Sequence, residues 1–174
     1  GKVMENIFQR TEALLGSSGI EKLRNSHIAI FGVGGVGGYV AEALARSGIG
    51  KFTLIDNDTV SFTNINRQII ALHSTVGRYK TEVMKERILD INPKAEVIIK
   101  NSFFMPENSH EYDFSDYDYI FNRSGICTSD CARTSVYSYV LNNGILEHAL
   151  GVHHPEQAFV LTINFVVRKG ISTS

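Results

Sequence analysis

The stretch from residue 28 to residue 38, IAIFGVGGVGG, restricts the fold more than any other part of the chain. Four apolar residues lead directly into glycines spaced as Gly32-x-Gly34-x-x-Gly37, with Gly35 between the last two. In such a fingerprint the first glycine permits a tight turn, the second lets a phosphate approach the backbone, and the third lets a helix pack closely on the strand. The stretch therefore predicts a buried strand, a phosphate-binding turn and a helix.

The residues after the glycines complete this unit. Apolar residues recur at helical spacing across residues 39–47, and a helix that starts at the glycines directs its free N–H groups at an anion in the turn. Residues 52–55 form a second apolar run that ends at Asp56, 19 positions after Gly37. A ribose-binding acid is expected about 20 residues on in such a unit. Strand, glycines, helix, strand and acid in this order predict a nucleotide site.

The remaining apolar patterns indicate the fold class. They predict a helix over 80–91 and strands at 96–100 and 119–121, while residues 1–25 are predicted to be a helical lead-in. Alternating strands and helices with one glycine fingerprint predict an α/β fold that is Rossmann-like and doubly wound. We expect a mostly parallel sheet with helices on both faces, and a single nucleotide-binding domain across all 174 residues.

The composition excludes several classes of protein. Apolar residues make up 43% and charged residues 20%, which is typical of a globular chain rather than a disordered one. A formal net charge of −1 gives no overall basic surface for nucleic acid, so any RNA contact needs a local patch or another subunit. The sequence has no apolar run of 18 residues, so it predicts no membrane span, and no apolar signal core is found near residue 1. We therefore expect a cytoplasmic protein.

A polar connection follows the second strand. Ligands of open parallel sheets bind at the carboxyl ends of the strands, so this connection is well placed to contact a nucleotide. An arginine there suits phosphate, because its planar fork can donate two charge-assisted hydrogen bonds. Lys80 adds a second cation where the next helix begins. The polar residues of the connection are Asp58, Asn64, Asn66, Arg67 and Gln68.

The charges favour one nucleotide over another. A dehydrogenase would use Asp56 for the ribose of NAD, but it also needs a second nucleotide-binding half and a substrate domain, for which the chain has little room. Arg67 and Lys80 instead favour a triphosphate, because a departing pyrophosphate concentrates negative charge that such cations stabilise. We therefore expect ATP, with NAD as the alternative.

Several motifs carry a resemblance to a known family. In order they are FGVGGVG (31–37), LIDND (54–58), TNINRQ (63–68) and VGRYK (76–80). This series resembles the ThiF/MoeB/HesA family of ubiquitin-activating-like adenylating enzymes. Within the family, the chain looks most like the bacterial tRNA threonylcarbamoyladenosine dehydratases, on the stretches IFQRTE (7–12), AEALARSGIG (41–50) and INP (91–93). The resemblance covers roughly residues 7–121.

The resemblance implies an activity, cofactors and partners. It implies that the chain binds ATP and Mg²⁺, that a substrate carboxylate attacks the α-phosphate and that pyrophosphate leaves. In the dehydratases, a group of the same modified nucleotide then attacks the acyl adenylate and closes a ring. The implied partners are a second copy of the chain and a tRNA substrate. The alternative substrate is the C-terminus of a sulfur-carrier or ubiquitin-like protein.

The resemblance also assigns roles to residues of this sequence. Asp56 is expected at the ribose, and Arg10 matches an arginine that the family supplies across a dimer interface. Arg10, Arg67 and Lys80 are the expected catalytic cations. The expected nucleotide-binding residues are Gly32, Gly34, Gly35, Gly37, Asp56, Asp58, Asn66, Arg67, Gln68 and Lys80.

The sequence departs from the family after residue 121. The family places an Asp-x-x-Asp motif there, whereas this chain reads Asn122-Arg123-Ser124-Gly125. Asp130 is the nearest acid, and we expect it to hold Mg²⁺ or face the reaction centre if the connection folds back. The alternative is that Asp130 caps the following helix. Because the family pattern is hard to find beyond residue 131, we expect a fragment or a divergent member, and a non-catalytic nucleotide-binding module is a third alternative.

Two cysteines lie in this divergent part. Cys127 and Cys131 are too few for a disulfide framework. A zinc site would need two further ligands, which His148, His153 and His154 could supply. A thioester role would need an activating base, and none is found nearby. Zinc ligand, thioester cysteine and ordinary thiol all stay open here, with the ordinary thiol favoured.

Overall fold

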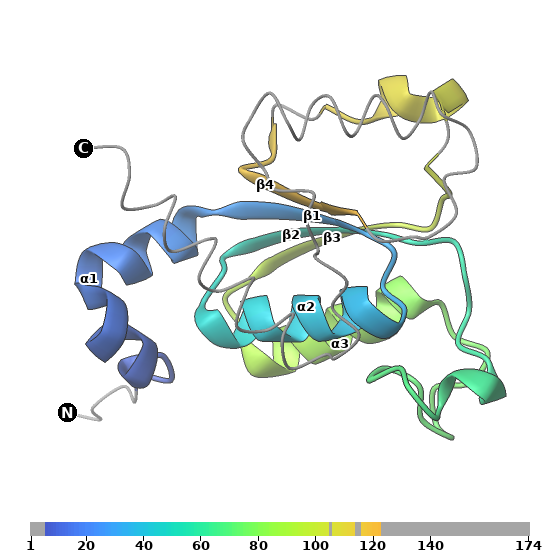
Figure 1. Cartoon of the computed structure of the whole chain (residues 1–174), viewed down its shortest axis with the longest axis horizontal. Coiled ribbons are helices and arrows are strands. Elements are labelled where there is room, and N and C mark those ends of the chain that lie inside the picture. The colour runs from blue at the N-terminus through green and yellow to red at the C-terminus, as the bar shows by residue number, and fades with distance from the viewer. Residues whose placement is uncertain (1–5, 105, 114–115, 123–174) are drawn as a thin grey trace.

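The computed structural model describes residues 6–104, 106–113 and 116–122 of the chain (Figure 1). In chain order the elements are α1 (Gln9–Asn25), β1 (His27–Phe31), α2 (Gly35–Ser47), β2 (Lys51–Ile55), η1 (Phe62–Asn64), α3 (Lys80–Ile91), β3 (Glu96–Lys100), η2 (Pro106–Glu111) and β4 (Tyr119–Asn122). The strands and helices predicted from the apolar patterns up to residue 122 are confirmed, with bounds that differ by a few residues.

The four strands form one parallel sheet in the order β3-β2-β1-β4. This is the order in which a doubly wound nucleotide-binding sheet begins. The register pairs Phe31 at the end of β1 with Ile55 at the end of β2, and Ile55 with Lys100 at the end of β3. The carboxyl ends of these strands therefore lie at one edge, and the predicted parallel α/β fold is confirmed.

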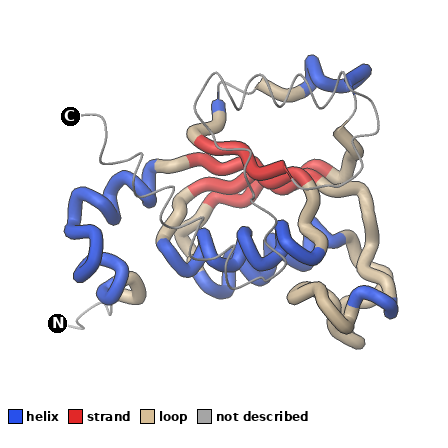
Figure 2. Tube along the Cα trace, in the orientation of Figure 1, coloured by secondary structure: helices blue, strands red, loops and turns tan. Residues whose placement is uncertain are grey.

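The two faces of the sheet are covered differently (Figure 2). Helices α2 and α3 lie along one face, where the main core packs around Phe52, Leu44 and Met84. A smaller cluster on the other face joins Phe31 to Phe104 and Tyr112, from the segment that precedes β4. Within the described residues both sheet-packing α-helices lie on one face, so helices on the second face stay a prediction.

The glycine turn between β1 and α2 depends on two close constraints. Gly32 has a φ of 88°, in the left-handed region that favours glycine. A β-carbon added at Gly37 would lie 1.8 Å from the carbonyl oxygen of Gly32. At Gly35, by contrast, an added β-carbon would meet no atom within 4 Å. The chain can therefore enter α2 at this distance from β1 only with glycine at position 37.

We expect Gly37→Ala to lower the free energy of unfolding by about 1–3 kcal/mol, as forced overpacking does. Gly35→Ala should leave it within about 0.5 kcal/mol, because the added methyl group meets open space. Chemical denaturation of both variants measures this difference. Equal stability of the two variants would contradict the close approach described for Gly37.

His27 joins the start of β1 to the segment before β4. Its backbone N–H donates to Asp118 Oδ2 at 2.7 Å. Its Nδ1 lies 2.8 Å from the carbonyl oxygen of Asp116, and its Nε2 lies 2.9 Å from Thr53 Oγ1. A carbonyl only accepts, so Nδ1 carries the proton and a neutral ring accepts from Thr53. Burial, with nearby Lys51, lowers the pKa of His27 more than the Asp116 carbonyl and the two carboxylates raise it.

This pKa shift predicts how stability depends on pH. Because the folded-state pKa of His27 is below its ordinary value, the unfolded chain takes up a proton first as the pH falls below about 6.5. Stability is therefore lost as the pH falls through this value. We expect His27→Gln to lose less stability than wild type between about pH 7 and pH 5.5. Parallel curves for the two proteins would show that another group titrates.

Candidate functional site

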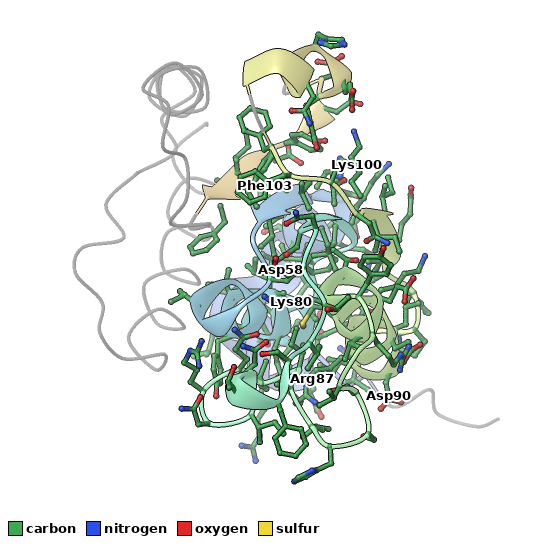
Figure 3. All side chains as sticks on the ribbon, turned by 90° about the vertical axis from the view of Figure 1, so that its right-hand side faces the viewer. Asp58, Lys80, Arg87, Asp90, Lys100 and Phe103 are labelled. Atoms are coloured by element: carbon green, nitrogen blue, oxygen red, sulfur yellow. The ribbon has the colours of Figure 1, made fainter. Side chains whose placement is uncertain are left out.

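A cavity of about 400 Å³ opens at the carboxyl end of the sheet. Figure 3 looks onto this end, with Asp58 and Lys80 near its centre and Phe103 above them. Four segments meet there: the glycine turn, the connection after β2, the start of α3, and the residues after β3. The lining residues are Phe31, Gly32, Gly34, Gly35, Val36, Gly37, Ile55, Asp56, Asn57, Asp58, Asn64, Arg67, Gln68, Lys80, Ser102, Phe103 and Phe104.

The N-terminus of α2 forms one wall of the cavity. Gly34 precedes the helix, and no side chain caps its first N–H groups. The first turn of α2 also contains no acidic residue. Free N–H groups and the positive end of the helix dipole make this wall suited to an anion.

Asp56 ties the glycine turn to the connection after β2. Its Oδ2 accepts from the backbone N–H of Val33 at 2.8 Å, and its Oδ1 accepts from the backbone N–H of Asp58 at 2.9 Å. Each carboxylate oxygen keeps further acceptor capacity, and Asp56 lines the cavity. The carboxylate can therefore hold the turn and also accept from a ligand hydroxyl.

Lys80 places a cation at the base of the cavity. It begins α3, and its side chain is only 8% exposed. Its Nζ donates to Asp58 Oδ2 at 2.7 Å, while the Asp58 side chain is 61% exposed. A second tie joins the two residues, because the backbone N–H of Lys80 donates to the carbonyl oxygen of Asp58 at 3.0 Å.

The polar connection places Arg67, Gln68 and Asn64 on the cavity. Arg67 is exposed, and its guanidinium donates to the carbonyl oxygen of Thr63 and to Asn66 Oδ1, both at 2.9 Å. Asn66 thus contacts Arg67 and is not among the lining residues. Asn64 lines the cavity instead of Asn66, because a capping box with Ser61 fixes the direction of the Asn64 side chain.

Gln68 lines the cavity and has a polar atom without a partner among the described residues. The residue is 8% exposed, and its Oε1 is buried with no hydrogen-bond donor among the described residues. Its Nε2 would lie 3.5 Å from a β-carbon added at Gly34. Because a buried acceptor without a donor costs free energy, this amide is ready to bond to a ligand.

The residues after β3 also line the cavity, although the sequence patterns did not single them out. Ser102, Phe103 and Phe104 line it. Phe104 is 7% exposed and packs on Phe31 with ring centroids 5.2 Å apart, whereas Phe103 is less buried. They follow a strand that pairs in parallel with β2, so the strand-end rule applied to β3 would have found them.

Some predicted residues lie elsewhere. Arg10 is exposed on α1, which lies at the amino end of the sheet in Figure 1, and is not among the lining residues. The described part of the chain holds no group of three or more His, Cys, Asp or Glu side chains that could bind a metal. It also holds no helix long and apolar enough to span a membrane. Residues that lie outside the described part are Asp130, Cys127, Cys131, His148, His153 and His154.

The chain is similar to proteins with known names. It is 49% identical over 117 residues to the tRNA threonylcarbamoyladenosine dehydratase of Bacillus subtilis, which covers 67% of this chain and 46% of that protein. It is 34% identical over 139 residues to the adenylyltransferase and sulfurtransferase UBA4 of Kluyveromyces lactis, covering 79% of this chain and 28% of that protein.

The fold of the chain is also similar to that of a solved dehydratase structure. The Escherichia coli tRNA N6-threonylcarbamoyladenosine dehydratase TcdA in complex with ATP matches with a TM-score of 0.73 and 39% identity, covering 83% of this chain and 58% of that one. The chain thus spans about half the length of the relatives it matches. The model of the ThiF family matches residues 8–144. With more than half of its residues inside that match, the chain belongs to the ThiF family.

Proposed function

We propose that this chain binds ATP and adenylates a substrate carboxylate, and that the substrate is threonylcarbamoyladenosine in tRNA. The observation that carries the proposal is one cavity that joins the uncapped N-terminus of α2, Asp56 and Lys80. The similarity to dehydratases of this name, one of them solved with ATP, supports the choice of nucleotide and of substrate.

The cavity suits the parts of ATP in turn. The N–H groups at the start of α2, with Gly32, Gly34, Gly35 and Gly37 around them, bind the phosphates. Asp56 accepts from the ribose hydroxyls, and Phe103 offers an aromatic surface to the adenine ring. Gln68 Oε1, which has no donor among the described residues, accepts from a nucleotide hydroxyl or amine. A volume of about 400 Å³ is within the usual range for a ligand site.

Mg²⁺ would be held in this site together with the phosphates of ATP. Magnesium is usually held by one or two carboxylates together with substrate phosphates and water. Asp56 and Asp58 are the acids among the lining residues; Asp56 accepts from two backbone N–H groups, and Asp58 is paired with Lys80. The donor set therefore fits a metal carried mainly by phosphate oxygens. Asp130, outside the described residues, stays the predicted additional carboxylate.

The proposed reaction is a substitution at phosphorus, in which cationic residues stabilise the charge of the leaving group. A carboxylate oxygen of the substrate forms a bond to the α-phosphorus as the bond from that phosphorus to pyrophosphate breaks. Lys80 and Arg67 stabilise the charge that collects on the leaving pyrophosphate. In the proposed cyclisation, a group of the same nucleotide attacks the acyl adenylate, closes the ring and releases AMP.

A second candidate function uses the same first step. The similarity to the adenylyltransferase and sulfurtransferase UBA4 favours the C-terminal carboxylate of a small carrier protein as substrate. The two functions differ in the acceptor, not in the ATP site. Exchange of labelled pyrophosphate into ATP, measured with tRNA, with a carrier protein and with neither, separates them. Exchange that depends on the carrier alone would overturn the tRNA proposal, and ATP binding without any exchange would support a non-catalytic module.

We expect Asp56→Ala to weaken ATP binding by about 1.5–3 kcal/mol through loss of charge-assisted bonds to the ribose. Calorimetry with ATP and with 2′,3′-dideoxy-ATP isolates the ribose contact. Wild type should bind the dideoxy nucleotide more weakly than ATP, whereas Asp56→Ala should bind the two alike. If the variant still prefers ATP as strongly as wild type does, Asp56 serves the glycine turn alone.

We further propose that the chain is a homodimer in which Arg10 acts in the partner's site. Arg10 is exposed and lies on α1, at the opposite end of the sheet from the connection that carries Arg67 (Figure 1). Leu14, four residues after Arg10 on the same helical face, is 85% exposed, and Ile7, in the turn before α1, is 63% exposed. These two exposed apolar residues support a protein contact near the arginine.

Mixing two inactive variants tests this arrangement. Arg10→Ala and Lys80→Ala should each reduce pyrophosphate exchange without unfolding the protein. When subunits of the two variants exchange, one site in each mixed dimer keeps both residues, so about half of the mixed-dimer sites should recover. Arg24→Ala is a matched control, since Arg24 is exposed on the same helix. No recovery despite subunit exchange would show that Arg10 does not act across the interface.

A further inference from the structure

The Lys80–Asp58 pair is unequal in its surroundings. The Lys80 side chain is 8% exposed, and Asp58 Oδ2, at 2.7 Å, is its hydrogen-bond partner among the described residues. A buried ammonium without a counter-ion is costly, because desolvation penalises the charged form. In the nucleotide-free chain, the charge of Lys80 is therefore compensated by the one carboxylate of Asp58.

Asp58 is able to leave this pair without disturbing the backbone. Its side chain is 61% exposed, so the carboxylate can turn into water at little cost. Its backbone is held independently, because its N–H donates to Asp56 Oδ1 and its carbonyl accepts from the N–H of Lys80. Only the side-chain contact breaks if Lys80 takes another partner.

The cavity supplies such a partner. Lys80 lines the same space as the N-terminus of α2, where an anion is expected to bind. A phosphate there can compensate the ammonium that Asp58 compensates in its absence. It also repels the carboxylate, since like charges in one cavity raise each other's free energy.

We propose that Asp58 is an exchangeable counter-ion. It pairs with Lys80 in the empty site, and a nucleotide phosphate replaces it as the partner of Lys80 on binding. This inference rests on the proposed ATP site and reassigns Asp58 from the nucleotide to the lysine. Phosphate binding then breaks an ion pair, so Asp58 weakens ATP binding while it stabilises the nucleotide-free chain. The exchange also makes Lys80 available in the cavity only when a phosphate is present.

A double-mutant cycle on the full chain tests the exchange. Calorimetry measures ATP affinity for wild type, Asp58→Asn, Lys80→Met and the double variant. Asp58→Asn should bind ATP about three- to tenfold more tightly than wild type, because no pair must break. In the Lys80→Met background the same change should alter affinity by less than about twofold. Asp58→Ser, which also keeps the backbone bonds, should behave like Asp58→Asn.

Adenosine and thermal unfolding complete the test. Adenosine carries no phosphate, so its affinity should be the same with and without Asp58→Asn. The nucleotide-free Asp58→Asn protein should unfold at a lower temperature than wild type, and saturating ATP should raise that temperature by more than it does in wild type.

Each other result overturns the exchange. Equal gains in both backgrounds would mean that Asp58 only adds negative charge near the phosphates. Weaker ATP binding by Asp58→Asn would mean that Asp58 binds the nucleotide or holds Lys80 in its binding position. A change in adenosine affinity would place Asp58 at the nucleoside. If wild type binds no ATP, the proposed function fails and the exchange fails with it, whereas ATP binding without the predicted coupling overturns the exchange alone.

Discussion

The double hydrogen bond accepted by the Asp56 carboxylate is the interaction on which the site depends. One oxygen holds the N–H of Val33 in the glycine turn, and the other holds the N–H of Asp58 in the connection after β2. These two segments leave neighbouring parallel strands, and the carboxylate joins them directly at the end of the sheet. Because the acceptor is charged, each bond is stronger than a neutral one. The turn and the connection are thereby fixed relative to one another before any ligand arrives.

The two helices that begin at the cavity are fixed to each other in a similar way. Glu42 of α2 accepts from Arg46 on its own helix and from Arg87 of α3. Burial alone would raise the pKa of Glu42, but the hydrogen bonds from the two arginines outweigh it and lower the pKa. The side chain of Glu42 is 12% exposed and that of Arg87 is 35% exposed, so this contact between α2 and α3 is partly buried. The contact therefore helps to hold α2 and α3, whose first residues line the cavity, against one another.

The sequence allowed most of this arrangement to be predicted, because the signals were local. The spacing from Gly32 to Gly37 and the acid at Asp56 follow from backbone geometry that does not depend on the rest of the chain. The choice between Asn64 and Asn66 did not follow, because a capping box decides which side chain enters the cavity. Phe103 was missed since the segment after β3 has no motif of its own. The roles of the residues beyond Phe121 stay predictions.

The sheet order has a consequence for how ligand binding is coupled to folding. All of the described residues that line the cavity lie between Phe31 and Phe104, within three successive strand units of a parallel sheet. A domain generally folds as one unit. A nucleotide that binds across these three strand units would therefore stabilise the domain as a whole by mass action, rather than the glycine turn alone.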